Sequence, residues 1–205
     1  GVYTSIHQHL MALDEAVFET NHWNQTLYTL MKNNNYYTGL VGKWHKLKKE
    51  DELQAAFHNF TIYYGHHYEE RDDEMVHVTT LNERDSVNFL HHWGLTQDNR
   101  AAQKKTKLPF FLTTSFFATH AQDENPISYD PTPLVLNSTY PDSLKIPTPK
   151  TATKEHFRRL PRFLRHRGNE GRYRWKNRFD PKSFQHNIKD MYAMATEVDA
   201  AVGAI

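Results

Sequence analysis

Residues 36–47 read Y-Y-T-G-L-V-G-K-W-H-K-L, a short apolar run that stops at Gly42 and is followed by Lys43, Trp44 and His45. This order is typical of a buried strand whose last residues carry functional groups. Residues two apart on an extended strand face the same side. We therefore expect Lys43 and His45 to lie on one side of the strand, so that a cation and an imidazole can contact the same ligand group. Trp44 should pack on the other side.

A second apolar stretch, residues 108–120, reads L-P-F-F-L-T-T-S-F-F-A-T-H. As far as Phe117 it is too continuously apolar for a half-exposed strand, which predicts a central, parallel strand. Polar residues follow its end, and His120 is one of them. Because ligands of an open α/β sheet bind beyond the carboxyl ends of the strands, we expect Lys43, His45 and His120 to converge there.

Both stretches resemble conserved elements of the sulfatase family. The first family pattern is G-Y-x-T-(small or apolar)-x-G-K-W-H, and the matching residues are Tyr36, Thr38, Gly42, Lys43, Trp44 and His45. The second pattern is P-F-F-L-x-x-S-F-x-x-x-H, and the matching residues are Pro109, Phe110, Phe111, Leu112, Ser115, Phe116 and His120. Asn35 stands where the family usually has glycine, and asparagine is the next-best residue for the left-handed turn that ends a helix.

The resemblance implies an α/β fold, a partial alkaline-phosphatase-like sandwich with a mostly parallel central sheet flanked by helices. Residues 1–205 would then be a fragment of a single sulfatase catalytic domain, lacking the N-terminal nucleophile segment and the C-terminal metal-ligand segment. The family's nucleophile is a formylglycine made from a cysteine in a C-x-P-S-R type motif, and the chain contains no cysteine. The ligands of the Ca²⁺ ion that the family uses are also expected outside this fragment, with no metal site within it.

The resemblance also assigns roles to three residues. The matching lysine of sulfatases contacts the sulfate, which makes Lys43 a catalytic and substrate-binding residue. His45 takes the role of the base, and His120 that of a donor to a sulfate oxygen or to the leaving oxygen. A sulfate ester spreads negative charge over its non-bridging oxygens as the S–O bond breaks, so fixed cations and donors suit its hydrolysis.

The expected activity is that of a sulfatase, a hydrolase of sulfuric esters, acting on sulfate monoesters of a small molecule or a glycan; the 205 residues alone are expected to be inactive. A phosphatase or phosphonate hydrolase of the same superfamily is an alternative, because phosphoryl transfer makes the same electrostatic demand. A noncatalytic fragment that binds sulfated glycans through the basic residues 154–182 is another. For that region we favour a solvated surface, because charge runs usually face water.

Composition and short motifs bear on partners and location. A net charge of +1 over 205 residues gives no support for a nucleic-acid partner, and no apolar run is long enough to predict a membrane span. N-x-S/T sequons make Asn24, Asn59 and Asn137 candidate glycosylation sites. We therefore expect a glycoprotein that is secreted, lysosomal or otherwise in the secretory pathway.

A first helix is predicted from Thr26, which is a suitable cap, to Asn34. Its apolar face would carry Leu27, Leu30 and Met31 at helical spacing.

Two further helices are predicted. Residues 80–83 read T-L-N-E, a capping box that opens a helix through about His92, followed by a polar linker at residues 97–107. Residues 187–205 form an amphipathic pattern at helical spacing.

The remaining stretches are predicted to be loops. Residues 46–74 are rich in charge and aromatic side chains, and residues 125–150 are rich in proline. The adjacent pairs His66–His67 and His91–His92 are expected to be solvated rather than metal ligands, because adjacent side chains point apart.

Overall fold

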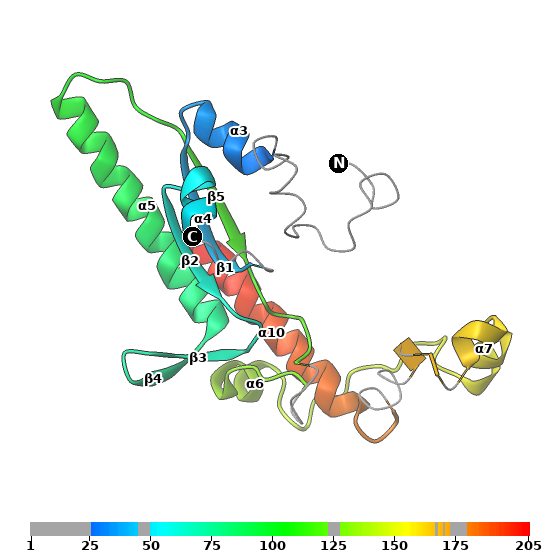
Figure 1. The fold of residues 1–205 in the computed structure, drawn as a ribbon. Helices are drawn as coiled ribbons and strands as arrows, with labels where there is room; N and C mark the ends of the chain where they lie inside the picture. The colour runs from blue at the N-terminus through cyan, green and yellow to red at the C-terminus, as the bar shows by residue number, and fades with distance from the viewer. Residues whose placement is uncertain (1–25, 45–49, 123–127, 167, 170, 173–179) are drawn as a thin grey trace. The chain divides into compact units, whose positions relative to one another are not determined.

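The computed structural model describes residues 26–44, 50–122, 128–166, 168–169, 171–172 and 180–205. The chain divides into two compact units, the first of residues 1–117 with 201–205 and the second of residues 118–200. The first unit is a mixed α/β structure with a small parallel sheet flanked by helices, in agreement with the predicted α/β class (Figure 1). Among the described residues no helix is both long enough and apolar enough to cross a bilayer.

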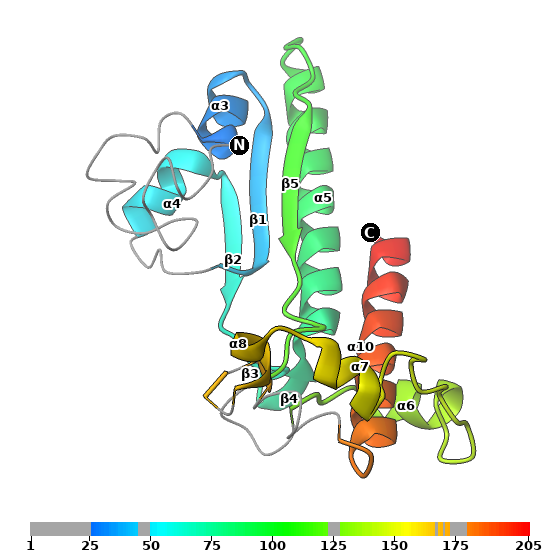
Figure 2. The ribbon, with the colours of Figure 1, turned by 90° about the vertical axis from the view of Figure 1, so that its right-hand side faces the viewer.

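The parallel sheet has the order β2-β1-β5 (Figure 2). The strand β1 (Tyr37–Lys43) lies between β2 (Asn59–Tyr63) and β5 (Phe110–Ser115) and is parallel to both. The two predicted strands and the parallel orientation are therefore confirmed. The central strand, however, is β1. Within the described part of the chain β5 pairs on one side only, so it is half-buried where full burial was predicted.

Alternation along β1 distributes its side chains to two covered faces. Leu40 packs with α4 (Glu50–Ala56) and with Tyr28 of the first helix, whereas Val41 packs with Leu81 of the long helix α5. Both strand residues are almost fully buried. Burial of such a side chain contributes about 1.5–3 kcal/mol, so these two contacts fix which face of β1 meets which helix.

The long helix α5 (Val78–Ala102) begins earlier and ends later than predicted. The capping box at residues 80–83 is not its start: the cap is His77, whose Nδ1 accepts from the Thr79 N–H group at 3.3 Å. The predicted end near His92 is wrong because the helix continues to a buried Gln97, whose side-chain oxygen accepts from the Leu108 N–H group at 2.7 Å.

Residues 46–74 were predicted to be a loop, and much of this region is regular. It contains α4, β2 and the first strand of an antiparallel hairpin, β3 (Tyr68–Arg71) with β4 (Glu74–His77). Asp72 and Asp73 form the turn with φ of 56° and 64°. Two consecutive positive φ angles suit a tight hairpin, and aspartate tolerates them better than most residues. The two adjacent aspartates were thus a hairpin signal.

The first helix is α3 (Leu27–Asn33), and its prediction is confirmed in position. The Thr26 side chain accepts from the Thr29 N–H group, and Asn35 takes the predicted left-handed conformation with φ of 63°. The predicted apolar face is wrong: Leu27 and Leu30 are about half exposed, and the buried residue is Thr29.

The second unit is mostly helical. It contains α6 (Pro133–Thr139), α7 (Lys154–Arg159) and α8 (Arg162–Arg165), together with most of α10 (Phe184–Ala204). The last helix confirms the amphipathic prediction, with a start three residues earlier than predicted. The helix α6 was not predicted, since it lies within the proline-rich stretch, where Pro133 occupies its first turn.

Side chains of α10 hold the proline-rich segment at two separate places along the helix. Gln185 both accepts from and donates to the backbone of Ile146, at 3.0 and 2.8 Å. Further along the helix, Glu197 accepts from the backbone N–H and the hydroxyl of Thr132, both at 2.6 Å. Desolvation raises the pKa of Glu197, although the two Thr132 hydrogen bonds oppose this shift.

Candidate active site

A glycine and a buried amide fix the carboxyl ends of β1 and β5. Gly42 has φ of 110°, a conformation that residues with a side chain rarely adopt. A Cβ atom there would lie 2.1 Å from the Ser115 carbonyl oxygen and 2.3 Å from Asn82 Nδ2. The Asn82 side chain donates to the carbonyl oxygens of Val41 and Ser115, at 3.5 and 3.4 Å. The two strand ends therefore require glycine at position 42.

Sequence reasoning missed this role of Asn82. The residue belonged to the supposed capping box, yet it is 1% exposed and faces the sheet from the second turn of α5. Its partners are 41 and 33 residues away in the chain. Only the pairing of Gly42 with Ser115 places both carbonyl groups at one amide.

Lys43 is the last residue of β1 and lies opposite Tyr63 in the parallel register. Its Nζ atom is 4.6 Å from the centroid of the Phe117 ring, a cation–π distance. Partial burial lowers the pKa of Lys43 through desolvation. Lys43 forms no ion pair with any residue that the structure describes. Its charge is therefore not neutralised by a neighbouring carboxylate of the described chain.

Glycine and aromatic residues surround the ammonium group. A Cβ atom at Gly65 would lie 3.3 Å from the Phe117 ring and 3.9 Å from Lys43 Nζ, so the absence of a side chain there leaves space beside the cation. Phe117 is 5% exposed, and the ring of His67 packs against it with centroids 5.0 Å apart. Lys43 is thus supported on an apolar, polarisable wall.

Two buried imidazoles continue this wall. His67 and His77 are 1% and 3% exposed, and their rings are nearly parallel with centroids 6.3 Å apart. The Val78 N–H group donates to the His67 carbonyl oxygen at 2.8 Å, which joins the loop after β2 to the start of α5. The prediction that both residues of the His66–His67 pair are solvated is wrong for His67. The sequence carried no signal for its burial, because its neighbours come from distant segments.

A polar cluster lies at the end of β2. The Tyr63 hydroxyl donates to Asp85 of α5, and Arg71 of the hairpin approaches the same carboxylate at 3.9 Å. Desolvation, followed by the hydrogen bond to Asp85, raises the pKa of Tyr63. The cluster ties β2, β3 and α5 together beside the strand end that carries Lys43.

Trp44 packs away from the Lys43 ammonium, as alternation predicts. Its ring contacts Tyr28 and Phe57 edge-on, with centroids 5.3 and 5.9 Å apart, and joins the cluster around Leu40.

Of the two other predicted site residues, the structure describes only one. His45 lies outside the described residues. His120 belongs to the second unit and is exposed, and its Nδ1 atom donates to the Ala121 carbonyl oxygen at 2.6 Å. With Nδ1 protonated, His120 could donate from Nε2 only as an imidazolium, which carries both protons. The convergence of Lys43, His45 and His120 stays a prediction.

The sequons occupy different environments. Asn137 is exposed on α6, whereas Asn59 is half-buried at the start of β2, and Asn24 lies outside the described residues. Of the two described, Asn137 has the accessibility that a glycan acceptor needs.

Within the described ranges no group of three or more histidine or carboxylate side chains could hold a metal ion, and none is assigned as a Ca²⁺ ligand. A scan against models of known protein families finds no match for the chain, and a search of curated proteins finds none either.

Proposed function

We propose that the chain is part of a sulfatase, a hydrolase that cleaves sulfate monoesters, with the substrate ester drawn from sulfated small molecules or glycans. The proposal includes the finer fold, an alkaline-phosphatase-like sandwich of which the β2-β1-β5 sheet would be a part. The chain would then belong to a catalytic domain of the secretory pathway, with Asn137 as the exposed one of its two described glycosylation candidates.

The observation that carries the proposal is the position of Lys43 and the environment of its charge. It stands at the carboxyl end of a central parallel strand, where α/β sheets bind ligands, and its desolvated charge has no described carboxylate partner. A partly desolvated cation stabilises developing negative charge more strongly than one in bulk water. Such a group suits an ester whose oxygens gain charge as the S–O bond breaks.

Each residue would have one task. Lys43 would bind a non-bridging sulfate oxygen, with Phe117 and His67 excluding water from one side of the ammonium. His45 would act as the general base, and His120 would donate a proton or a hydrogen bond to the ester. In the family that the motifs resemble, Ca²⁺ polarises the sulfate and a formylglycine is the nucleophile; no residue described in this structure is assigned to either.

A parallel assay tests the reaction class. The longer protein of which residues 1–205 are proposed to be a part, with its nucleophile and metal-ligand segments, is incubated with an aryl sulfate and with the corresponding aryl phosphate, and the two rates of phenol release are compared. Preference for the sulfate supports the proposal. Preference for the phosphate would favour a phosphatase, whose substrate makes the same demand on Lys43. Turnover of neither ester, together with retention on sulfated polysaccharide, would favour a noncatalytic binding function.

A further inference from the structure

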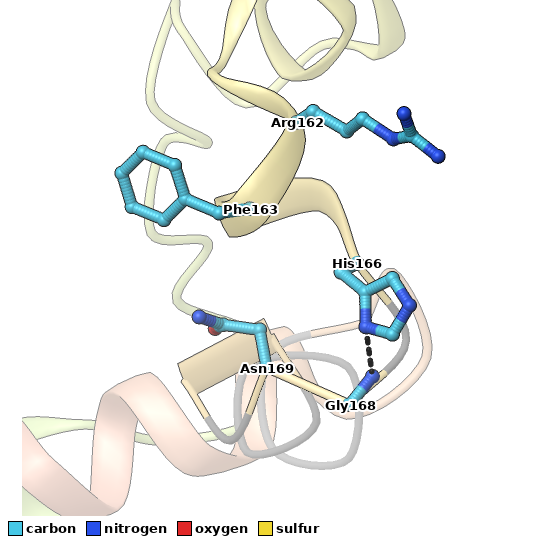
Figure 3. Close-up of a pocket in the computed structure, with 5 residues that line it drawn as sticks. All are labelled: Arg162, Phe163, His166, Gly168 and Asn169. Carbon is cyan, nitrogen blue, oxygen red and sulfur yellow. Dashed lines mark hydrogen bonds between the residues drawn. The ribbon is translucent and has the colours of Figure 1, made fainter.

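An open pocket lies at α8 in the second unit, far along the chain from Lys43. Its volume is about 700 Å³, within the range of small-ligand sites, and five residues line it: Arg162, Phe163, His166, Gly168 and Asn169 (Figure 3). Arg162 and His166 lie on one side of the pocket, and Phe163 and Asn169 on the other. The pocket therefore offers charge on one side and a ring and an amide on the other.

The polar side chains of the pocket all present hydrogen-bond donors once the internal bonds are counted. His166 Nδ1 accepts from the Gly168 N–H group at 3.2 Å, so the proton of the neutral ring is on Nε2. Asn169 Oδ1 accepts from the Arg172 N–H group at 2.9 Å, which leaves its NH₂ group as the free end of the amide. The Arg162 guanidinium donates only. Side chains that present donors and no free acceptor are complementary to an anion.

The surrounding surface has the same sign. Five further cationic residues between positions 154 and 172 are described: Lys154, Arg158, Arg159, Arg165 and Arg172. The single acidic residue described in this range, Glu155, is engaged by Arg159. Arg162 forms no ion pair with any of the residues the structure describes, so the positive charge at the pocket is not cancelled locally.

Phe163 indicates what else the ligand carries. The side chain is 69% exposed and lines the pocket, so its ring face is accessible to a ligand. An aromatic face beside cations and an amide donor suits a ring that has C–H groups on one face and hydroxyl and anionic groups at its edge. Sugar residues that bear sulfate or carboxylate groups have this chemistry.

The geometry points to a binding site for an anionic sugar residue of an acidic polysaccharide, with its sulfate or carboxylate on Arg162 and His166 and its apolar face on Phe163. An anionic membrane fits less well, because an amphipathic surface helix needs a continuous stripe. Here α7 and α8 are short, and extended backbone at Leu160 and Pro161, with ψ of 149° at both, separates them. This inference is independent of the sulfatase proposal.

The test measures binding of the full chain to a size-defined heparin oligosaccharide by calorimetry. Arg162→Ala and Phe163→Ser should each weaken binding about tenfold or more, since each removes a principal contact. Matched controls are Arg84→Ala, an exposed arginine of α5, and Leu134→Ser, an exposed apolar residue of α6 in the same unit as the pocket. The controls should bind nearly as tightly as the parent. All four residues are exposed, so the folded state should persist, which circular dichroism checks.

Two arms identify the ligand. A desulfated oligosaccharide of equal length assigns the bound anion: retained binding points to the carboxylate and lost binding to the sulfate, and both agree with the site. The binding measurement does not depend on turnover, so failure of the sulfatase proposal would not affect it. If a small aryl sulfate is hydrolysed, Arg162→Ala should leave that rate unchanged.

Three results would overturn the inference. In the first, Arg162→Ala would weaken binding no more than Arg84→Ala. The loss would then reflect the removal of one positive charge from the protein and not the loss of a contact in the pocket. In the second, a single-stranded oligonucleotide of equal charge would bind as tightly and lose as much on the same substitutions. In the third, vesicles of anionic lipid would bind as tightly as the oligosaccharide, and the same substitutions would weaken that binding as much.

Discussion

The Lys43 ammonium lies over the face of the Phe117 ring, 4.6 Å from its centroid. A carboxylate at the same place would hold the cation more strongly, but it would also neutralise the charge and compete with an incoming anion. A ring face stabilises the cation through its quadrupole and leaves its full charge in place. The contact therefore positions Lys43 without neutralising the charge that the proposed function requires.

Replacement of the ring should weaken the site. For Phe117→Leu we expect kcat/KM for an aryl sulfate to fall by about 2- to 30-fold, the equivalent of a cation–π contact of 0.5–2 kcal/mol. Desolvation lowers the pKa of Lys43, and the ring face opposes this shift because it stabilises the protonated amine; since leucine keeps the surroundings apolar, loss of the ring should move the alkaline rise in KM to lower pH. The control is Phe89→Leu, the same truncation of a buried ring that packs on Gly39. An equal fall in kcat/KM in both variants would show that the loss comes from core packing and not from the contact with Lys43.

The glycine before Lys43 should not tolerate a side chain. Gly42→Ala combines a φ of 110° with contacts of 2.1 and 2.3 Å, so we expect a loss on the order of 3 kcal/mol or more in the free energy of unfolding. Gly94→Ala is the matched control, because Gly94 is inside α5 and a Cβ there meets nothing within 4 Å. That variant should gain about 0.5–1 kcal/mol. Urea unfolding measures both, and equal stability of the two variants would contradict the account.

The Tyr63–Asp85 hydrogen bond should appear in alkaline unfolding. The pKa of Tyr63 is raised above its ordinary value of 10, so the stabilisation is complete below pH 10 and is lost as the pH rises further. Tyr63→Phe should cost about 1.5–3 kcal/mol at neutral pH, and this difference from the parent should shrink above pH 10. Tyr64→Phe, at an exposed neighbour, serves as the control. A difference that is constant with pH would exclude the raised pKa.

Glu197 should contribute less to the stability of the second unit as the pH rises, whereas a carboxylate in an ordinary ion pair contributes more. Burial raises its pKa, so its contribution to stability is present below the ordinary value of 4.5 and is lost as the pH rises through the raised value. Glu197→Gln keeps an acceptor for Thr132 and removes the buried charge. The variant should match or exceed the parent in unfolding free energy at neutral pH and fall behind it in acid. Thr132→Val, which removes one donor, should destabilise the protein at neutral pH.

Local signals in the sequence were sufficient for the strand that carries Lys43. The apolar run that stops at Gly42 predicts β1, and the capping residue Thr26 and the left-handed Asn35 were predicted from residue type alone. Each of these features depends on neighbours within a few residues. Helical spacing likewise predicted most of α10.

What surrounds Lys43 was not predictable, because its neighbours meet only in the folded chain. Asn82 binds strand ends 41 and 33 residues away, and His67 is buried by Phe117, fifty residues later. The end of α5 was missed for a similar reason: Gln97 is polar in sequence but pairs with the backbone of Leu108. A single sequence gives the types of these residues and not their partners.

The most direct test of the account is steady-state hydrolysis of an aryl sulfate by the longer protein of which residues 1–205 are proposed to be a part, carrying Lys43→Ala. The account predicts a fall in kcat of about 100- to 1,000-fold, the loss typical of one group that stabilises transition-state charge. Lys107→Ala, which removes an exposed lysine without a described partner, should leave the rate unchanged. Equal turnover by the parent and Lys43→Ala would contradict the assignment of Lys43 to the sulfate.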